Sequence, residues 1–494
     1  MGIGNNTVTR YHIIGIAGAG MSAIANLLLD QGHQVSGSDL SQNHLTAALS
    51  ARGAVIHHGH APDYVRGAEV VLATAAAAPD HVELRAAAAA GIPCLRRDDL
   101  WREWSRTRPI IAVAGSHGKT TTTAMIAWLL HAAGREPGFL IGSDAPNLGT
   151  NARWGNPHAP LVIEADEYDR AFLALTPIIA VVTNVEWDHP DIYPTAEQYH
   201  AAFSDFAMQT QGVIVTCGDG GLGAWHTAAA ANDMPFLTYG LDRANHYQAV
   251  LDIEPSADPA ILTRATVQHP KPSEPLVYAT NSVAAPFSPD LPAPILELGV
   301  PGLHNLRNAL AALVVADLYG VARDTAIAAL RTFRGTARRF ELVGVAGAIT
   351  VIDDYAHHPT EVHATLQAAR TRYPAPQRIV AYVQPHTYSR TRSLLEQWAG
   401  AFEYADLVLV GDVYPSRERE PEGTAHALAA MLAAQIGQQH PAVQTVGDPA
   451  QAAITISALL RPNDVLVAMG AGDSTHVAAQ VFRTVQQQAS EVRG

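Results

Sequence analysis

The stretch Ile110-Ile-Ala-Val-Ala-Gly-Ser-His-Gly-Lys-Thr-Thr-Thr-Thr-Ala-Met-Ile-Ala-Trp-Leu-Leu-His131 decides the fold of the chain. It begins with an apolar run typical of a buried strand, continues through a glycine turn and ends in an amphipathic helix. Gly115 and Gly118 allow the backbone to approach an anion, to which the start of the helix offers unpaired N–H groups. Lys119 adds a full positive charge, and a following threonine hydroxyl can reach a magnesium ion. The stretch predicts a nucleoside triphosphate site.

The match to a phosphate-binding loop is incomplete. The full pattern has a glycine five residues before Gly118, where this chain has Val113. An ordinary strand-to-helix turn is the alternative, and the position directly after an apolar strand argues against it. Lysine usage points the same way, because the chain has only Lys119 and Lys271 and otherwise uses arginine. Chance is the alternative to a specific need for an ammonium group at this turn.

The composition is that of an ordinary globular protein of several domains. At 494 residues we expect two to four folding units, and 48% hydrophobic with 16% charged residues excludes a disordered chain. The net charge of -14 argues against a general nucleic-acid surface. The two cysteines, Cys94 and Cys217, exclude a disulfide framework. Since we find neither a signal-like start nor a long apolar run, we expect a cytoplasmic protein without membrane contact.

The first segment repeats the order of strand, glycine turn and helix over residues 11–29. Gly15, Gly18 and Gly20 are spaced G-x-x-G-x-G, which differs from the dinucleotide-binding pattern. A second strand ends in Asp39, where folds of this kind contact a ribose. The segment therefore predicts a nucleotide-binding domain, and a nicotinamide-dependent oxidoreductase is the less favoured alternative.

Two later strands of the second segment end in acidic or imidazole side chains. The run 161–164 is apolar except for Glu164, and burying this charge without a partner would be costly, so we expect it to bind a cation or accept hydrogen bonds. The run that starts at Ile178 is followed by Asp188 and His189. For Asp166, Glu167 and Asp169 a solvated loop is an equal alternative to function.

The end of the second segment is less informative. Residues 255–297 are rich in proline and serine, which predicts loops between edge strands. A helix starting near Pro301 places Asn305 and Asn308 three residues apart on one face. The two amides could read the edge of a base, or they could cap the helix.

The third segment contains four further apolar runs that end in polar clusters, around residues 351–361, 379–392, 407–415 and 465–473. This alternation predicts another Rossmann-like domain. A turn before it contains the adjacent Arg338 and Arg339. His357 and His358 precede Pro359 and lack helical spacing, so ligand contact or helix capping is favoured over zinc binding.

Taken in order, these motifs resemble those of the Mur ligases, from residue 11 to about residue 475. The matching stretches are Gly15-Ile-Ala-Gly-Ala-Gly-Met-Ser22, Gly115-Ser-His-Gly-Lys-Thr-Thr121, Glu164-Ala-Asp-Glu167, Thr183-Asn-Val-Glu-Trp-Asp-His189, His304-Asn-Leu-Arg-Asn308, Gly335-Thr-Ala-Arg-Arg-Phe340, Asp353-Asp-Tyr-Ala-His-His-Pro359 and Gln384-Pro-His-Thr-Tyr-Ser-Arg390.

The resemblance implies an α/β protein of three domains. Residues 1–108 would form a Rossmann-like domain for the UDP end of a substrate. Residues 109–334 would form a central P-loop ATPase with a mostly parallel sheet, and residues 335–494 a Rossmann-like domain that closes over the amino acid. We expect a monomer or a homodimer.

The resemblance also implies an activity, namely ATP- and Mg²⁺-dependent joining of L-alanine to the carboxylate of UDP-N-acetylmuramate through an acyl phosphate, in peptidoglycan precursor synthesis. No lysine lies between Lys119 and Lys271, so the carbamoylated lysine of later family members has no counterpart, which favours the alanine-adding branch. A ligase that recycles murein tripeptide stays open. A nucleotide sensor without turnover is an alternative from another class, disfavoured by the joint presence of Lys119, Glu164 and His189.

Site residues follow from the matching positions. The catalytic group would be Lys119, Glu164, His189, Arg338, Asp353 and His357. ATP would contact Gly115, Ser116, His117, Gly118, Lys119, Thr120 and Thr121, with Asn305 and Asn308 at the adenine. The substrates would contact Gly18, Ala19, Gly20, Met21, Ser22, Asp39, Arg339, His386 and Arg390. Magnesium would be held by Thr120 and Glu164, and His189 would lie at a second metal or near the incoming amine.

Overall fold

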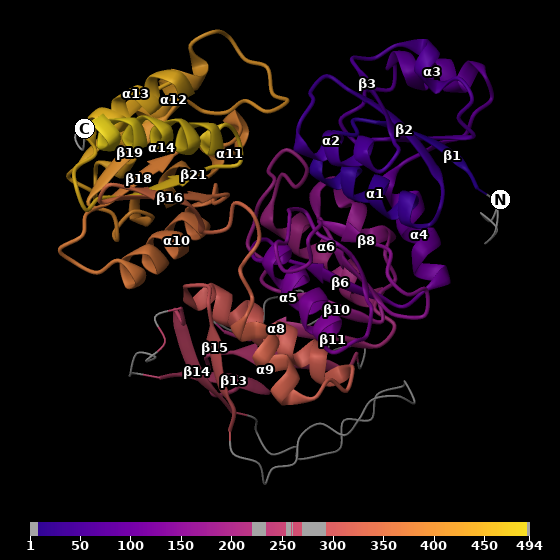
Figure 1. Cartoon of the computed structure of the whole chain (residues 1–494), viewed down its shortest axis with the longest axis horizontal. Coiled ribbons are helices and arrows are strands. Elements are labelled where there is room, and N and C mark those ends of the chain that lie inside the picture. Colours follow the sequence, from indigo (N-terminus) through magenta and orange to yellow (C-terminus); the bar gives the residue numbers. More distant parts are fainter. Residues whose placement is uncertain (1–7, 220–233, 253–257, 259, 269–292, 492–494) are drawn as a thin grey trace.

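The chain folds into three α/β domains, each organised around its own sheet (Figure 1). The computed structural model describes residues 8–219, 234–252, 258, 260–268 and 293–491. The predicted fold class is confirmed, since most strand pairs in all three sheets are parallel. Lys271 and most of the proline-rich stretch lie outside the described residues.

The N-terminal domain has a five-stranded parallel sheet of order β3-β2-β1-β4-β5, the doubly wound arrangement of a Rossmann-like fold. Its strands are β1 (Arg10–Ile14), β2 (Gln34–Asp39), β3 (Val55–His58), β4 (Val70–Ala73) and β5 (Cys94–Leu95). Its helices are α1 (Ala19–Asp30), α2 (His44–Ala51), η1 (Pro62–Val65), α3 (Val82–Ala89) and α4 (Arg97–Thr107).

The central domain has a ten-stranded sheet of order β15-β14-β13-β12-β11-β10-β6-β9-β7-β8 within the described ranges. The strands are β6 (Ile110–Ala114), β7 (Gly138–Leu140), β8 (Ala152–Arg153), β9 (Leu161–Glu164), β10 (Ile179–Val182), β11 (Val213–Cys217), β12 (Phe236–Gly240), β13 (Tyr247–Leu251), β14 (Thr263–Gln268) and β15 (Ile295–Leu298). The helices are α5 (Lys119–Ala132), η2 (Tyr168–Ala174), α6 (Ala196–Met208), α8 (Leu303–Leu318) and α9 (Arg323–Arg331).

Strand β6 lies in the middle of this sheet, and all five of its residues are buried. Such a run without polar alternation is typical of a parallel strand covered on both faces. Strand β14 lies within the proline-rich stretch and β15 at its end; the two pair antiparallel, and β15 is at the edge of the sheet.

The C-terminal domain has a six-stranded sheet of order β16-β17-β21-β18-β19-β20, in which only the β16–β17 pair is antiparallel among the described pairs. The strands are β16 (Glu341–Ala346), β17 (Ile349–Asp354), β18 (Ile379–Val383), β19 (Leu407–Gly411), β20 (Val443–Gly447) and β21 (Val465–Met469). The helices are α10 (Pro359–Arg372), α11 (Tyr388–Ser393), η3 (Leu395–Gly400), α12 (Thr424–Ile436), α13 (Pro449–Leu459) and α14 (Ser474–Glu491).

Apolar packing links the domains unequally. One buried cluster joins Ile13 and Leu27 of the N-terminal domain to Ile163 and Phe172 of the central domain. The buried clusters of the C-terminal domain, as far as the structure describes them, contain no residue from the other two. Burial of shared apolar surface opposes separation. The N-terminal and central domains are therefore held to each other more firmly than the C-terminal domain is held to either of them.

Candidate active site

A cleft of about 1040 Å³ lies where the three domains meet. The carboxyl ends of β6, β9 and β10 are directed towards it, the usual place for a ligand in an open α/β sheet. The predicted site residues that line it are Ala19, Ser116, Lys119, Thr120, Glu164, His189, Arg338, Arg339, His357, His386 and Arg390. Those that do not are Gly18, Gly20, Met21, Ser22, Asp39, Gly115, His117, Gly118, Thr121, Asn305, Asn308 and Asp353.

The turn between β6 and α5 needs its two glycines. Gly115 has φ +136°, and a Cβ atom there would lie 2.0 Å from Oγ1 of Thr183. Gly118 has φ +83°, and its Cβ would lie 2.7 Å from Oδ1 of Asn308. The amides of Ser116 and His117 are held by Asn184, so the loop is anchored to the chain after β10. The following amides, in the first turn of α5, have no partner within the helix and can bind an anion.

The ammonium of Lys119 lies over this turn. Its Nζ is 2.8 Å from Oε2 of Glu167 and donates a 2.6 Å hydrogen bond to the carbonyl of Gly115. The solvated-loop interpretation of Glu167 is wrong, because its side chain is 0% exposed. Burial would raise the pKa of Glu167, but the charges of Lys119 and His189 outweigh burial and lower the pKa to about 2.

Glu164 accepts two short hydrogen bonds at the end of β9. Oγ1 of Thr120 donates to Oε1 at 2.8 Å, and the backbone N–H of Gly142 donates to Oε2 at 2.6 Å. Burial raises the pKa of Glu164 despite these two bonds. In the described part of the chain this carboxylate forms no ion pair at 4.0 Å or less. A carboxylate and a hydroxyl oxygen side by side at a cleft fit a hard divalent cation.

His189 follows β10 and lies beside Glu167, with a left-handed backbone at φ 54°. Its Nε2 is 3.4 Å from Oε1 of Glu167, and Nη2 of Arg390 donates to its Nδ1 at 3.1 Å. Both ring nitrogens therefore have protein partners in this arrangement. The structure pairs His189 with Glu167 and gives no ion pair between it and Glu164.

The asparagines of α8 lie behind the turn. Gly302 is the N-cap residue, so neither asparagine occupies the capping position. Asn305 donates to the carbonyl of Pro301 at 2.8 Å, and Asn308 donates to Oδ1 of Asn305 at 3.3 Å. Oδ1 of Asn308 faces Gly118. The contact with adenine stays a prediction.

Two arginines enter the cleft from the C-terminal domain. The guanidinium groups of Arg338 and Arg339 lie 5.0 and 5.1 Å from the ring centre of Tyr355. Arg338 has φ 58°, lies 3.4 Å from the carboxylate of Asp353 and donates to the carbonyl of Gly470. Asp353 is 4% exposed, so it holds Arg338 from behind and does not face the cleft.

Two imidazoles lie beside these arginines. The rings of His357 and His386 are 5.6 Å apart, and Nη1 of Arg390 donates to Nδ1 of His386 at 3.2 Å. Burial lowers the pKa of His357 to about 4 and that of His386 to about 2. Both rings are therefore neutral at pH 7. Nδ1 of His357 donates to the carbonyl of Tyr355 at 2.9 Å, which leaves its Nε2 as an acceptor.

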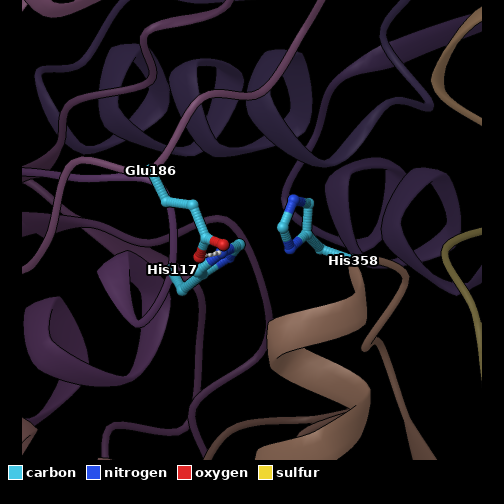
Figure 2. A group of neighbouring side chains, drawn as sticks. All are labelled: His117, Glu186 and His358. Carbon is cyan, nitrogen blue, oxygen red and sulfur yellow. Dashed lines mark hydrogen bonds and ion pairs between the residues drawn. The ribbon is translucent and has the colours of Figure 1, made fainter. Parts of the chain in front are cut away.

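His358 caps α10, as one of the two interpretations of its sequence predicted, and accepts from the amide of Thr360. Figure 2 shows its ring facing His117 of the phosphate-binding turn, with Glu186 beside them. One ligand atom from each of the three lies within 4.8 Å of the others, and Nε2 of His117 is 3.1 Å from Oε2 of Glu186. The central and C-terminal domains thus meet at a polar contact.

Three family models match the chain. The Mur ligase family, catalytic domain, matches residues 10–108, the Mur ligase middle domain residues 113–316, and the Mur ligase, glutamate ligase domain, residues 338–472. A UDP-N-acetylmuramate–L-alanine ligase of Roseiflexus sp. (strain RS-1) is 52% identical over 491 residues, covering 97% of this chain and 100% of that protein. The chain belongs to the Mur ligase family. A ligase of the same name from Chloroflexus aggregans is also 52% identical over 491 residues.

Two solved structures share the architecture of this Mur ligase. The crystal structure of UDP-N-acetylmuramate-alanine ligase MurC from Thermotoga maritima is 26% identical, with a TM-score of 0.76, and the match covers 98% of this chain and 99% of that one. A murein peptide ligase from Psychrobacter arcticus is 25% identical, with a TM-score of 0.68, covering 97% and 99%. Among the described residues of this Mur ligase no helix has the length and apolarity to cross a membrane.

The N-terminal wall of the cleft differs from the sequence expectation. Asp39 accepts hydrogen bonds from the amides of Ala17 and Ser41, so its carboxylate shapes the loop after β2. Met21 and Ser22 are buried in α1, and only Ala19 of the glycine-turn motif lines the cleft. Residues 41–45 line it as well. In the sequence, these residues are marked only by Asn43, which is typical of a helix start and forms a capping box with Thr46 at the start of α2.

Proposed function

We propose that this Mur ligase joins L-alanine to the carboxylate of UDP-N-acetylmuramate while ATP is converted to ADP and phosphate. The observation that carries the proposal is the 52% identity, over the full length of the Roseiflexus protein, with an enzyme named for this reaction. The cleft offers the parts that the reaction requires: an anion-binding helix start, a lysine, a paired carboxylate and hydroxyl, and two arginines.

The chemistry explains the need for a nucleoside triphosphate. A carboxylate is a poor electrophile, and an amine attacks it only after an oxygen has become part of a good leaving group. Phosphorylation by ATP gives an acyl phosphate, the amine attacks its carbonyl carbon, and phosphate departs. Both the carboxylate and the γ-phosphate are anionic, so positive charge from Lys119, Arg338 and Arg339 is needed to bring them together.

ATP would bind with its phosphates at the start of α5. The amides of residues 118–121 point along the helix axis towards the anion, and the helix dipole adds to their attraction. Lys119 would exchange part of its contact with Glu167 and the carbonyl of Gly115 for phosphate oxygens. Glu167 keeps the ammonium charged, because it and Asp166 raise the pKa of Lys119 against the opposing effect of burial.

Thr120 and Glu164 are the residues that fit a magnesium ion, since the half-buried carboxylate has no ion-pair partner among the described residues. When bound there, the ion would neutralise phosphate charge as a Lewis acid. His189 has partners on both ring nitrogens, so the proposal for the cation rests on Thr120 and Glu164.

The amine would be received on the C-terminal side. Nε2 of His357 is a free acceptor at the cleft wall and can take a hydrogen bond from the attacking amino group. The neutral state of His357 and His386 avoids repulsion with a cationic ammonium. We propose that residues 335–494 hold the amino acid, residues 109–334 the ATP, and residues 1–108 the UDP end of the acceptor.

Phosphate release from ATP tests the proposal. The purified protein is given UDP-N-acetylmuramate and Mg²⁺ with L-alanine, glycine, L-serine or the murein tripeptide in turn, and the product is identified by mass. We expect release with L-alanine and a product heavier by one alanyl residue. The similarity to a murein peptide ligase makes tripeptide addition the second candidate, and preferential use of the tripeptide would replace the proposal with it. If no phosphate is released with any of the amino acids or with the tripeptide, both candidate functions are refuted.

A further inference from the structure

Glu361 lies in the first turn of α10, where a glutamate commonly serves to cap the helix. It is the third residue of α10 and completes a capping box with His358. Its Oε2 accepts from the backbone N–H of His357 at 3.0 Å and from that of His358 at 3.3 Å. Glutamate is common at this position of a helix because it satisfies such amides. The cap, however, uses only one of the two carboxylate oxygens.

The other oxygen, Oε1, faces two cationic side chains outside α10. Nδ1 of His117, in the phosphate-binding turn, lies 3.3 Å away, and Nη1 of Arg339 lies 3.5 Å away. The carboxylate is 9% exposed and lines the cleft. Burial would raise the pKa of Glu361, but His357, His117 and Arg339 together lower it well below its ordinary value. A helix cap alone would not require these contacts.

His117 is the partner contributed by the central domain. It faces Glu186 from the chain after β10, Glu361 from α10, and the ring of His358 at 4.8 Å. Burial would lower the pKa of His117, but Glu361 and Glu186 raise it to about 9. His358 stays neutral, because burial and the charge of His117 lower its pKa. At pH 7 one imidazolium therefore lies between carboxylates from two domains.

We infer that Glu361 is a positioning residue of ligation, which fixes the phosphate-binding turn, through His117, relative to Arg339 and His357 on the C-terminal side of the cleft. The inference rests on the proposed function and deepens it. Because His117 and Glu361 belong to different domains, their ion pair forms only when the C-terminal domain lies against the central one. The pair thus favours the arrangement in which the phosphate and amine sites face each other, a condition for the two chemical steps to share one acyl phosphate.

Glu361→Gln tests the charge without removing the cap, since a glutamine oxygen still accepts from the two amides. We expect kcat for ligation to fall at least about 10-fold, while Kd for ADP changes less than about twofold. His117→Gln should have a similar effect. The double variant should be no slower than the slower single variant, whereas independent effects would multiply. Glu403→Gln is the matched control, because it removes an exposed ion pair with His363 of the same helix and should leave kcat unchanged.

The pH profile separates positioning from a purely structural role. The ratio of wild-type to Glu361→Gln activity should be constant between about pH 7 and 8 and shrink above about pH 9, where His117 of the wild type loses its proton. The inference is overturned if the effects of the two single variants multiply in the double variant, or if kcat of Glu361→Gln equals that of the wild type. In either case, turnover by the wild-type protein would still support the proposed function. If Glu361→Gln does not fold, the kcat of His117→Gln and its dependence on pH test the inference instead. A wild-type protein without turnover would overturn both.

Discussion

Arg390 and Asp188 form a two-pronged ion pair that joins the C-terminal domain to the central domain. Nε of Arg390 lies 2.8 Å from Oδ1 of Asp188, and Nη2 lies 3.1 Å from Oδ2. The side chains are 7% and 5% exposed. A buried guanidinium needs a compensating charge, so this pair opposes separation of the two domains. The central and C-terminal domains share no buried apolar cluster among the described residues. Polar contacts of this kind therefore hold the C-terminal domain against the central one.

Asp188→Asn should therefore weaken closure. Asparagine keeps the shape of aspartate but leaves the guanidinium of Arg390 without its countercharge. We expect kcat/KM for the amino acid to fall at least about 10-fold, and the radius of gyration measured by small-angle scattering to increase. Glu420→Gln is the control, because it removes the exposed partner of Arg392 on the same helix. Unchanged kinetics and scattering in Asp188→Asn would contradict the role given to this pair.

Lys119→Ala should abolish ligation, because the phosphates lose their ammonium partner. It also leaves Glu167 buried without its main countercharge, so the melting temperature should fall. The double variant Lys119→Met with Glu167→Gln removes both charges and should recover most of the melting temperature without recovering phosphate release. Calorimetry and the release assay on the same samples measure the two effects. Near-normal product formation by folded Lys119→Ala would disprove the assignment.

How far the sequence predicts this site depends on how local each signal is. Lys119 and the two glycines belong to one continuous motif, so the turn after β6 was predictable. That the carboxylate of Glu164 accepts hydrogen bonds was predictable as well, because one charge at the end of an apolar strand needs a partner. These signals depend on neighbours in sequence and require no knowledge of the tertiary fold.

Glu361 shows why the rest was not predictable. In the sequence it is an ordinary helix-cap glutamate, and its contacts with His117 and Arg339 exist only after two domains have come together. Asp39 is the converse case. Its place at the end of the second strand predicts a ribose contact, which stays a prediction, while the structure shows its carboxylate accepting from the amides of Ala17 and Ser41. Spacing along the chain cannot distinguish a carboxylate that faces a ligand from one that satisfies its own loop.

Glu164→Gln should raise the magnesium requirement. The single oxygen of glutamine can still accept from the amide of Gly142, and its NH₂ group can donate to the hydroxyl of Thr120, so the local structure should persist while the negative charge is lost. We expect the half-saturating Mg²⁺ concentration for phosphate release to increase at least about 10-fold, because a hard cation binds a charged oxygen far better than a neutral one. A magnesium titration at saturating ATP measures this. A curve that superimposes on that of the wild type would rule out Glu164 as a ligand.

The N-terminal domain should lose stability in acid through Glu83. This carboxylate is 0% exposed and bonds to Nε2 of His12, to Oγ of Ser38 and to Nδ1 of His60. Burial would raise the pKa of Glu83, but His12 and Ser38 outweigh it and lower the pKa from 4.5 to about 2. The unfolded chain therefore binds more protons between these values, so the stabilisation is present above about pH 4.5 and is lost as the pH falls towards 2.

At 1.36 kcal/mol per pKa unit, this carboxylate contributes about 3 kcal/mol to the free energy of unfolding at pH 7. Glu83→Gln should remove most of that contribution and flatten the fall in stability between about pH 4.5 and 2. Urea unfolding followed across this pH range compares the two proteins, with Glu69→Gln, which loses an exposed pair with Arg10, as the control. Parallel stability curves for wild type and Glu83→Gln would show that the buried carboxylate does not control acid unfolding.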